Sequence, residues 1–153
     1  TQRRRGCQLS IGPLDGGLKG AGTRLESGTS RQTILVVEDE PMVRSLTARM
    51  LHRLGDRTVL AADAGAALER LRDTPTISLV ISDVVLPGGL DGVALAEACT
   101  ALQPGLPVAL ASGYPQDALG RDARDPGRFA LLSKPYSTDQ LASFVARQLQ
   151  RTG

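Results

Sequence analysis

The sequence predicts an α/β fold in which a doubly wound, five-stranded parallel sheet carries helices on both faces. Short runs of β-branched and aliphatic residues alternate with segments of helical periodicity from Thr33 to Gln150. The connections between these segments are short and rich in Gly, Pro and Asp. Because right-handed crossovers between successive strands leave those strands parallel, this alternation specifies a single sheet. A chain of 153 residues is long enough for one such domain and hardly for two.

Each predicted strand is an apolar run that stops at polar or turn-forming residues. The third is the clearest, since five residues from Ile77 precede Ser82-Asp83 and the turn Leu86-Pro87-Gly88-Gly89. A run of this kind is typical of a strand buried on both faces. The five predicted strands are Ile34–Val37, Thr58–Leu60, Ile77–Ile81, Pro107–Ala111 and Phe129–Leu132.

The predicted helices follow the strands in turn. Pro41 suits a first helical turn, Gly55 suits a helix end, and Ser137 is a good N-cap for the last helix. That last helix has an apolar stripe of Leu141, Phe144, Val145 and Leu149. The predicted ranges are Pro41 to Leu54, Ala64 to Leu71, Val93 to Leu102, Gln116 to Ala123, and the segment after Ser137.

Composition excludes several classes of protein. The apolar fraction of 41% and charged fraction of 22% are ordinary for a globular domain. No apolar run approaches the roughly 18 residues of a membrane span, and no signal peptide is evident, so a cytoplasmic location is expected. A net charge of +2 gives no reason to expect direct nucleic-acid binding. Cys7 and Cys99 lack the spacing of a zinc or disulfide framework.

The first 32 residues differ from the rest of the chain. They are rich in glycine and lack apolar periodicity, so that they cannot bury enough surface to offset the entropy of ordering. We therefore expect a flexible leader or linker over residues 1–32 and a folded domain over 33–150. Since position 1 is Thr rather than Met, the chain is expected either to be a part of a longer protein or to carry added residues at its start.

Chemically active side chains lie at the carboxyl ends of four predicted strands. These residues are Glu38, Asp39, Asp83, Ser112 and Lys134. The carboxyl edge of an open α/β sheet is where ligands bind, so the five side chains are expected around one cleft. Clustered carboxylates favour Mg²⁺, and an Asp beside that ion can take a phosphoryl group while a lysine neutralises the growing charge. A serine that then bonds the new phosphoryl group makes a switch.

As a set, these residues resemble a response-regulator receiver domain of two-component signalling over residues 33–149. The features that carry the resemblance are Glu38-Asp39, Asp83, the LPGGLDG turn, Ser112-Gly113 and Lys134-Pro135. The resemblance implies a flavodoxin-like (βα)5 fold with strand order 2-1-3-4-5. It also implies that Asp83 accepts phosphate from a sensor histidine kinase or a histidine phosphotransfer domain.

The same resemblance implies a role for each residue of the cleft. Asp39, Asp83 and the backbone carbonyl of Val85 would bind Mg²⁺, and Glu38 would act mostly through a metal-bound water. Lys134 would pair with the phosphoryl group, and its peptide bond to Pro135 would be cis. Ser112 would report phosphorylation to the face formed by the fourth helix, fifth strand and fifth helix.

Two features depart from the common receiver pattern. Many members carry Tyr or Phe three residues before the lysine, where this chain has Leu131, so the resemblance does not extend to output coupled to an aromatic ring. Phe129 lies on the same strand face, two positions earlier. The LPGGLDG turn is one residue longer than the commoner form and, with Ser112-Gly113-Tyr114, resembles receivers attached to hybrid sensor kinases.

The leading hypothesis is therefore a phosphoacceptor switch with slow self-dephosphorylation rather than a turnover enzyme. It would be a lone receiver or the C-terminal receiver of a hybrid histidine kinase, with homodimerisation possible. One alternative is an aspartyl-nucleophile phosphohydrolase, although Val85 stands where such enzymes usually carry a second carboxylate. Another is a docking module that works without phosphorylation.

Overall fold

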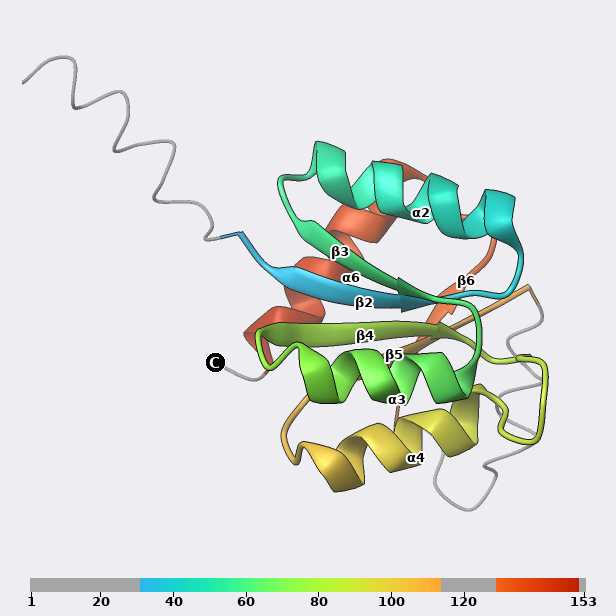
Figure 1. Cartoon of the computed structure of the whole chain (residues 1–153). Helices are drawn as coiled ribbons and strands as arrows, with labels where there is room; N and C mark the ends of the chain where they lie inside the picture. Colours follow the sequence, from blue (N-terminus) through green and yellow to red (C-terminus); the bar gives the residue numbers. More distant parts are fainter. Residues whose placement is uncertain (1–30, 114–128, 152–153) are drawn as a thin grey trace, which may run out of the picture. The chain divides into compact units, whose positions relative to one another are not determined.

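The structure is a computed structural model and describes residues 31–113 and 129–151. The elements, with the labels of Figure 1, are β2 (Thr33–Val37), α2 (Pro41–Arg53), β3 (Arg57–Ala61), α3 (Ala64–Asp73), β4 (Ile77–Asp83), α4 (Gly92–Leu102), β5 (Val108–Ser112), β6 (Ala130–Ser133) and α6 (Thr138–Gln150). Strands and helices alternate from β2 to β5, and β6 and α6 complete the described elements (Figure 1).

The five strands form one parallel sheet in the order β3-β2-β4-β5-β6. Counted along the described chain, this is the predicted order 2-1-3-4-5, so both the fold class and the topology are confirmed. β4 and β5 extend further than expected and end at Asp83 and Ser112 themselves. The helix predicted over 116–123 lies outside the described residues.

Local capping explains where the helices begin. The Asp63 carboxylate accepts from the Ala66 backbone N–H at 2.7 Å, and Asp91 does the same for Ala94 at 2.9 Å. Ser137 and Gln140 form a reciprocal capping box at the start of α6, with bonds of 3.1 and 2.8 Å. These caps satisfy backbone donors that a helix leaves unpaired.

Helices cover both faces of the sheet (Figure 1). The sheet therefore separates the hydrophobic core into two layers. Helices α3 and α4 pack Ala67, Leu71, Leu95 and Cys99 on one face. Helices α2 and α6 pack Leu51, Leu141 and Phe144 on the other. Because the residues of each central strand enter both layers, those strands are mostly apolar, which is the pattern that made them recognisable.

The folded unit includes Gln32, at the end of the predicted leader. Its backbone carbonyl accepts from Arg57 at 2.7 Å, and its side-chain oxygen accepts from Ser78 at 2.9 Å. Residues 1–30 lie outside the described residues, and their assignment as a leader stays a prediction. No helix within 31–113 or 129–151 is long and apolar enough to cross a membrane.

Candidate functional site

The sheet register brings the predicted site residues to one edge. Val37 pairs with Ser82, Asp83 with Ala111, and Ser112 with Ser133. Asp83 and Ser112 belong to these pairs, and Glu38 and Lys134 directly follow paired residues, so all four lie at the carboxyl edge of the sheet. The site is thus positioned by backbone pairing of four strands, β2, β4, β5 and β6.

Three carboxylates converge at this edge. Oxygen atoms of Glu38, Asp39 and Asp83 all lie within 4.8 Å of one another. Glu38 is buried, Asp83 is partly buried and Asp39 is exposed, so that the cluster is open to solvent on one side. The structure therefore brings together the three acidic side chains that the sequence placed in a cation site.

Lys134, the residue after β6, completes the cluster with a positive charge. Its Nζ lies 2.9 Å from Oε2 of Glu38 and 3.4 Å from Oδ1 of Asp83. The ammonium of Lys134 neutralises one of the three carboxylate charges. The cluster and its lysine therefore carry a formal charge of two negative units. Such a site suits a divalent cation.

The pKa values respond to this crowding. Burial raises the pKa of Glu38 above its ordinary value, and the charge of Asp83 adds to this against the opposing hydrogen bond from Lys134. Burial disfavours the charged form of Lys134, but its hydrogen bond to Glu38 and the nearby charge of Asp83 outweigh this and raise the Lys134 pKa. Lys134 is therefore held as an ammonium at neutral pH.

The main chain of Asp83 is fixed from two directions. The buried hydroxyl of Ser82 donates to the Asp83 carbonyl oxygen at 2.9 Å. Gly92, the first residue of α4, lies so close that a Cβ there would overlap that same carbonyl oxygen. The Gly92 backbone N–H also donates to the Val84 carbonyl at 2.7 Å. These contacts join the start of α4 directly to Asp83.

Glu38 is also held by its surroundings. A guanidinium nitrogen of Arg44, one turn into α2, donates to the Glu38 carbonyl at 2.7 Å. Oε1 of Glu38 accepts from the Glu40 backbone N–H at 3.3 Å. Its own N–H donates to the Ala61 carbonyl at 3.0 Å. Helix α2 and strand β3 therefore fix the buried member of the cluster.

Ser112 and Lys134 are linked through the backbone. Ser112 is 6% exposed and ends β5, and its carbonyl accepts from the Lys134 N–H at 2.9 Å. The Lys134–Pro135 peptide bond is cis, as expected from the resemblance. Ser112 therefore lies beside the segment that carries the site lysine.

Val85 and the two apolar residues before Lys134, Phe129 and Leu131, were also singled out from the sequence. Val85 follows the cluster by two residues and its side chain is 62% exposed, while the role of its carbonyl as a metal ligand stays a prediction. Phe129 and Leu131 pack against the same core layer, although Phe129 lies one residue before β6 begins and is not part of the strand. Leu131 itself is only partly buried there.

Sequence reasoning missed several contacts that support the site. The hydroxyls of Thr47 and Tyr136 lie 2.7 Å apart, joining α2 to the segment after Lys134. Burial raises the pKa of Tyr136, so its hydroxyl stays protonated. Neither this bond nor the contact of Gly92 with Asp83 has a sequence signal, because each joins residues that only the folded backbone brings together.

Comparisons with known proteins identify a family for most of the described chain. The family model described as "Response regulator receiver domain" matches residues 34–146. Sensor kinase CckA of Brucella abortus (strain 2308) is 35% identical over 120 residues, which are 78% of this chain and 13% of that protein. Response regulator receiver protein CpdR of the same strain is 30% identical over 116 residues, or 76% of this chain and 95% of that protein.

Solved structures extend the likeness. The receiver domain from the hybrid histidine kinase CckA is 36% identical, with a TM-score of 0.63 and coverage of 77% of this chain and 99% of that one. The receiver domain of NtrX from Brucella abortus is also 36% identical, with a TM-score of 0.69 and coverage of 76% and 98%. The folded part of this chain belongs to the response regulator receiver domain family of two-component signalling.

Proposed function

We propose that Asp83 is the phosphoacceptor of a Mg²⁺-dependent phosphorelay step and that the domain switches conformation while it is phosphorylated. The observation that carries the proposal is the position of Lys134, whose Nζ lies 2.9 Å from Glu38 and 3.4 Å from Asp83 inside a three-carboxylate cluster. A carboxylate nucleophile beside a fixed ammonium is an arrangement suited to phosphoryl transfer.

The donor set fits a hard divalent cation. Glu38, Asp39 and Asp83 offer only carboxylate oxygens, which suit Mg²⁺, and the ion would offset the two negative charges left by Lys134. When bound, Mg²⁺ supplies positive charge to the oxygens of the transferring phosphoryl group. We assign the direct contacts to Asp39, Asp83 and the carbonyl of Val85, and an indirect contact to Glu38.

The transfer itself is a substitution at phosphorus. A carboxylate oxygen of Asp83 forms a bond to phosphorus as the bond between phosphorus and the donor histidine nitrogen breaks, and the product is an aspartyl phosphate. Lys134 stabilises the charge on the phosphoryl oxygens during this exchange. Water later attacks the aspartyl phosphate slowly and restores the Asp83 carboxylate, which makes the domain a timed acceptor and not a turnover enzyme.

Ser112 is the proposed reporter of the phosphorylated state. It ends the strand next to β4, and its carbonyl is already bonded to the Lys134 backbone. A hydrogen bond from its hydroxyl to the new phosphoryl group would move the end of β5. That shift would reach the surface of β6 and α6, where Leu131 replaces the usual aromatic residue.

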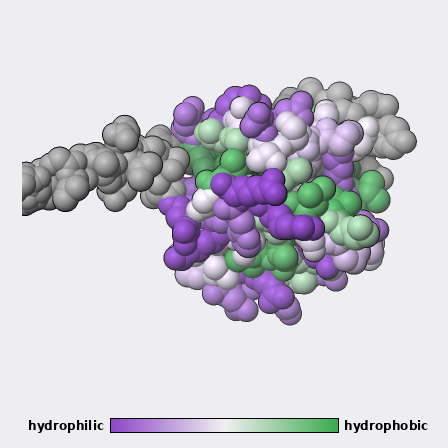
Figure 2. Space-filling view, turned by 90° about the horizontal axis from the view of Figure 1, so that it is seen from above, coloured by the Kyte–Doolittle hydropathy of each residue, from purple (hydrophilic) through white to green (hydrophobic). Residues whose placement is uncertain are grey.

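The phosphodonor is proposed to dock beside the site, on α2. Met42 and Leu46 are one helical turn apart and are 79% and 50% exposed, and Val85 across the site is 62% exposed. Figure 2, seen from above, shows several groups of hydrophobic side chains on a largely hydrophilic face. A sensor histidine kinase or a histidine phosphotransfer domain that covers these side chains would bring its histidine to Asp83.

Two settings for the domain follow from its relatives. The chain spans 13% of sensor kinase CckA but 95% of CpdR, so it resembles both a domain of a larger kinase and a protein that consists of one receiver. We propose a cytoplasmic receiver in one of these two forms. Assignment as a phosphohydrolase is not favoured, because the second position after Asp83 is the exposed, uncharged Val85.

The test is the intact mass of the protein after incubation with acetyl phosphate. With Mg²⁺, the wild-type chain should gain one phosphoryl group that is lost again over minutes to hours, and EDTA should prevent the gain. Asp83→Asn should remain unmodified. A folded wild-type domain that binds Mg²⁺ and gains no phosphoryl group would favour the phosphorylation-independent docking module.

A further inference from the structure

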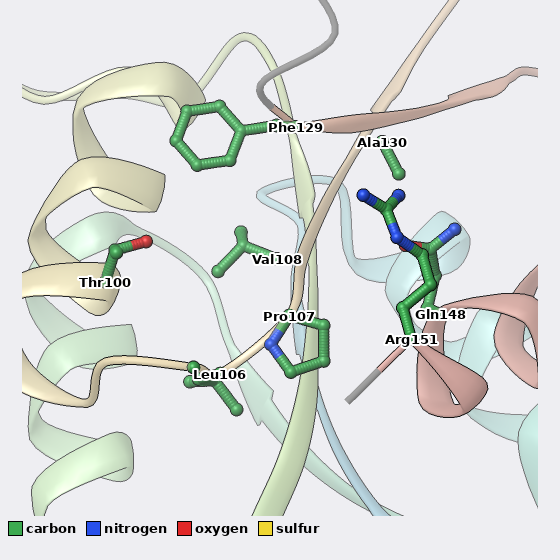
Figure 3. Close-up of a pocket in the computed structure, with 9 residues that line it drawn as sticks. Thr100, Leu106, Pro107, Val108, Phe129, Ala130, Gln148 and Arg151 are labelled. Carbon is green, nitrogen blue, oxygen red and sulfur yellow. The ribbon is translucent and has the colours of Figure 1, made fainter. Parts of the chain in front are cut away.

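A hollow of about 310 Å³ lies at the amino edge of β5 and β6, the edge opposite the carboxylate cluster (Figure 3). Its walls come from the end of α4, the segment that enters β5, the start of β6 and the last turn of α6. This volume is at the lower end of those that hold small molecules in proteins. The site therefore has room for a compact ligand.

Two polar side chains of α6 mark one side of the hollow. Gln148 is only 6% exposed, and within residues 31–113 and 129–151 its side-chain amide has no hydrogen-bond partner. Arg151, one turn later, brings its guanidinium beside Gln148 in Figure 3, and no described carboxylate pairs with it. Burying an amide without a hydrogen bond costs free energy, and a ligand that bonds to Gln148 would recover part of that cost.

The opposite walls are apolar. Leu106, Pro107, Val108 and Phe129 line them, and the lining residues include no Asp or Glu. The site thus combines one cation, one free amide and a hydrophobic surface. The negative end of the α6 dipole opposes anion binding, but its partial charge of about half a unit is smaller than the full charge of Arg151.

We propose that this hollow binds a small organic carboxylate with a flat or branched apolar body, of about the size of benzoate. Arg151 bonds the carboxylate, the Gln148 amide donates to one of its oxygens, and the apolar body lies against Pro107, Val108 and Phe129. The site is separate from Asp83, so the proposal does not depend on phosphoryl transfer. The domain would then bind a small carboxylate at one edge of the sheet and be phosphorylated at the other.

The test is a titration of the ¹⁵N-labelled chain with sodium benzoate, followed by amide NMR shifts against sodium chloride at equal ionic strength. We expect saturable shifts with millimolar affinity at Thr100, Leu106 and Ala130 and in the last turn of α6. Arg151→Gln should weaken binding at least tenfold. Arg147→Gln is the matched control, because it removes a charge from the same helix without lining the hollow, and it should bind benzoate normally.

Two further measurements separate a ligand site from a purely structural role. Gln148→Leu should raise the melting temperature by removing a buried unpaired amide, yet weaken benzoate binding several-fold. Benzyl alcohol, the neutral counterpart, should bind at least tenfold more weakly than benzoate. The proposal would be overturned if Arg151→Gln bound benzoate as tightly as the wild type, or if Arg147→Gln lost as much affinity as Arg151→Gln. Unchanged benzoate binding by Gln148→Leu, or the absence of saturable shifts in the wild type, would overturn it as well.

Discussion

Gly92 lies directly against the carbonyl oxygen of Asp83, with no room for a Cβ between the start of α4 and the end of β4. The Gly92 N–H donates to the next carbonyl, that of Val84, at 2.7 Å. The position of the candidate phosphoacceptor therefore depends on the absence of a side chain at a residue nine positions later.

Gly92→Ala should damage both the fold and the site. The added methyl group must push α4 away from Asp83, so we expect the free energy of unfolding to fall by about 1–3 kcal/mol and the rate of phosphorylation to fall with it. Urea denaturation and the acetyl phosphate reaction measure the two effects. Gly89→Ala is the control, because a Cβ there meets nothing within 4 Å. Equal behaviour of the two variants would contradict the steric argument.

Lys134→Gln should separate cation binding from phosphoryl transfer. Without the ammonium, the three carboxylates attract Mg²⁺ more strongly, and we expect affinity measured by calorimetry to rise about tenfold. The same change should slow phosphorylation on the order of a hundredfold, since the charge on the phosphoryl oxygens loses its partner. Arg70→Gln removes one positive charge from a residue bonded to the Leu60 carbonyl and should change neither quantity. Loss of Mg²⁺ affinity in Lys134→Gln would count against this account.

Leu46→Asp should affect transfer from a protein donor but not from a small molecule. Leu46 is half exposed on α2 beside the site, and a charge there would be buried against a docked kinase or phosphotransfer domain. We expect at least tenfold slower transfer from the phosphorylated protein and an unchanged rate with acetyl phosphate. Leu102→Asp, at the end of α4 and 46% exposed, is the matched control. Equal slowing by both substitutions would move the docking site away from α2.

Cys99 should make stability depend on pH in alkaline solution. Burial raises the pKa of its thiol to about 11 from an ordinary value of 9.0. Because only the unfolded chain loses this proton between these values, unfolding becomes more favourable as pH rises from 9.0 to about 11, by roughly 3 kcal/mol at most. Cys99→Ala should lose less stability over the same interval in urea denaturation. Parallel pH profiles for the two proteins would show that the thiol does not contribute.

The sequence predicted most of the fold because its strongest signals are local. Apolar runs that end at Asp83, Ser112 and Lys134 identified both the strands and the carboxyl edge where their chemistry meets. Strand order then placed those residues together, as the 2.9 Å contact between Lys134 and Glu38 demonstrates. Prediction of a site at a sheet edge therefore needs the correct strand ends and the correct strand order.

The features of the fold and the site that were not predicted depend on contacts between distant residues, for which a single sequence carries no signal. Thr47 and Tyr136 are 89 residues apart and bond only because α2 and the segment after β6 meet. The apolar stripe of α6 was predicted, and the helix also buries Gln148, which lies on that stripe four residues after Phe144 but whose polar side chain is of a type usually exposed. The close approach of Gly92 likewise depends on the path of the turn after Asp83.

The most direct test of the central claim is to locate the phosphoryl group. Borohydride reduces an aspartyl phosphate to homoserine, so the chain phosphorylated in Mg²⁺ can be reduced, digested and sequenced by mass spectrometry. The account predicts homoserine at position 83 and nowhere else. Homoserine at Asp39, at Asp91 or at another acidic residue, with position 83 unchanged, would contradict the assignment of Asp83 as the phosphoacceptor.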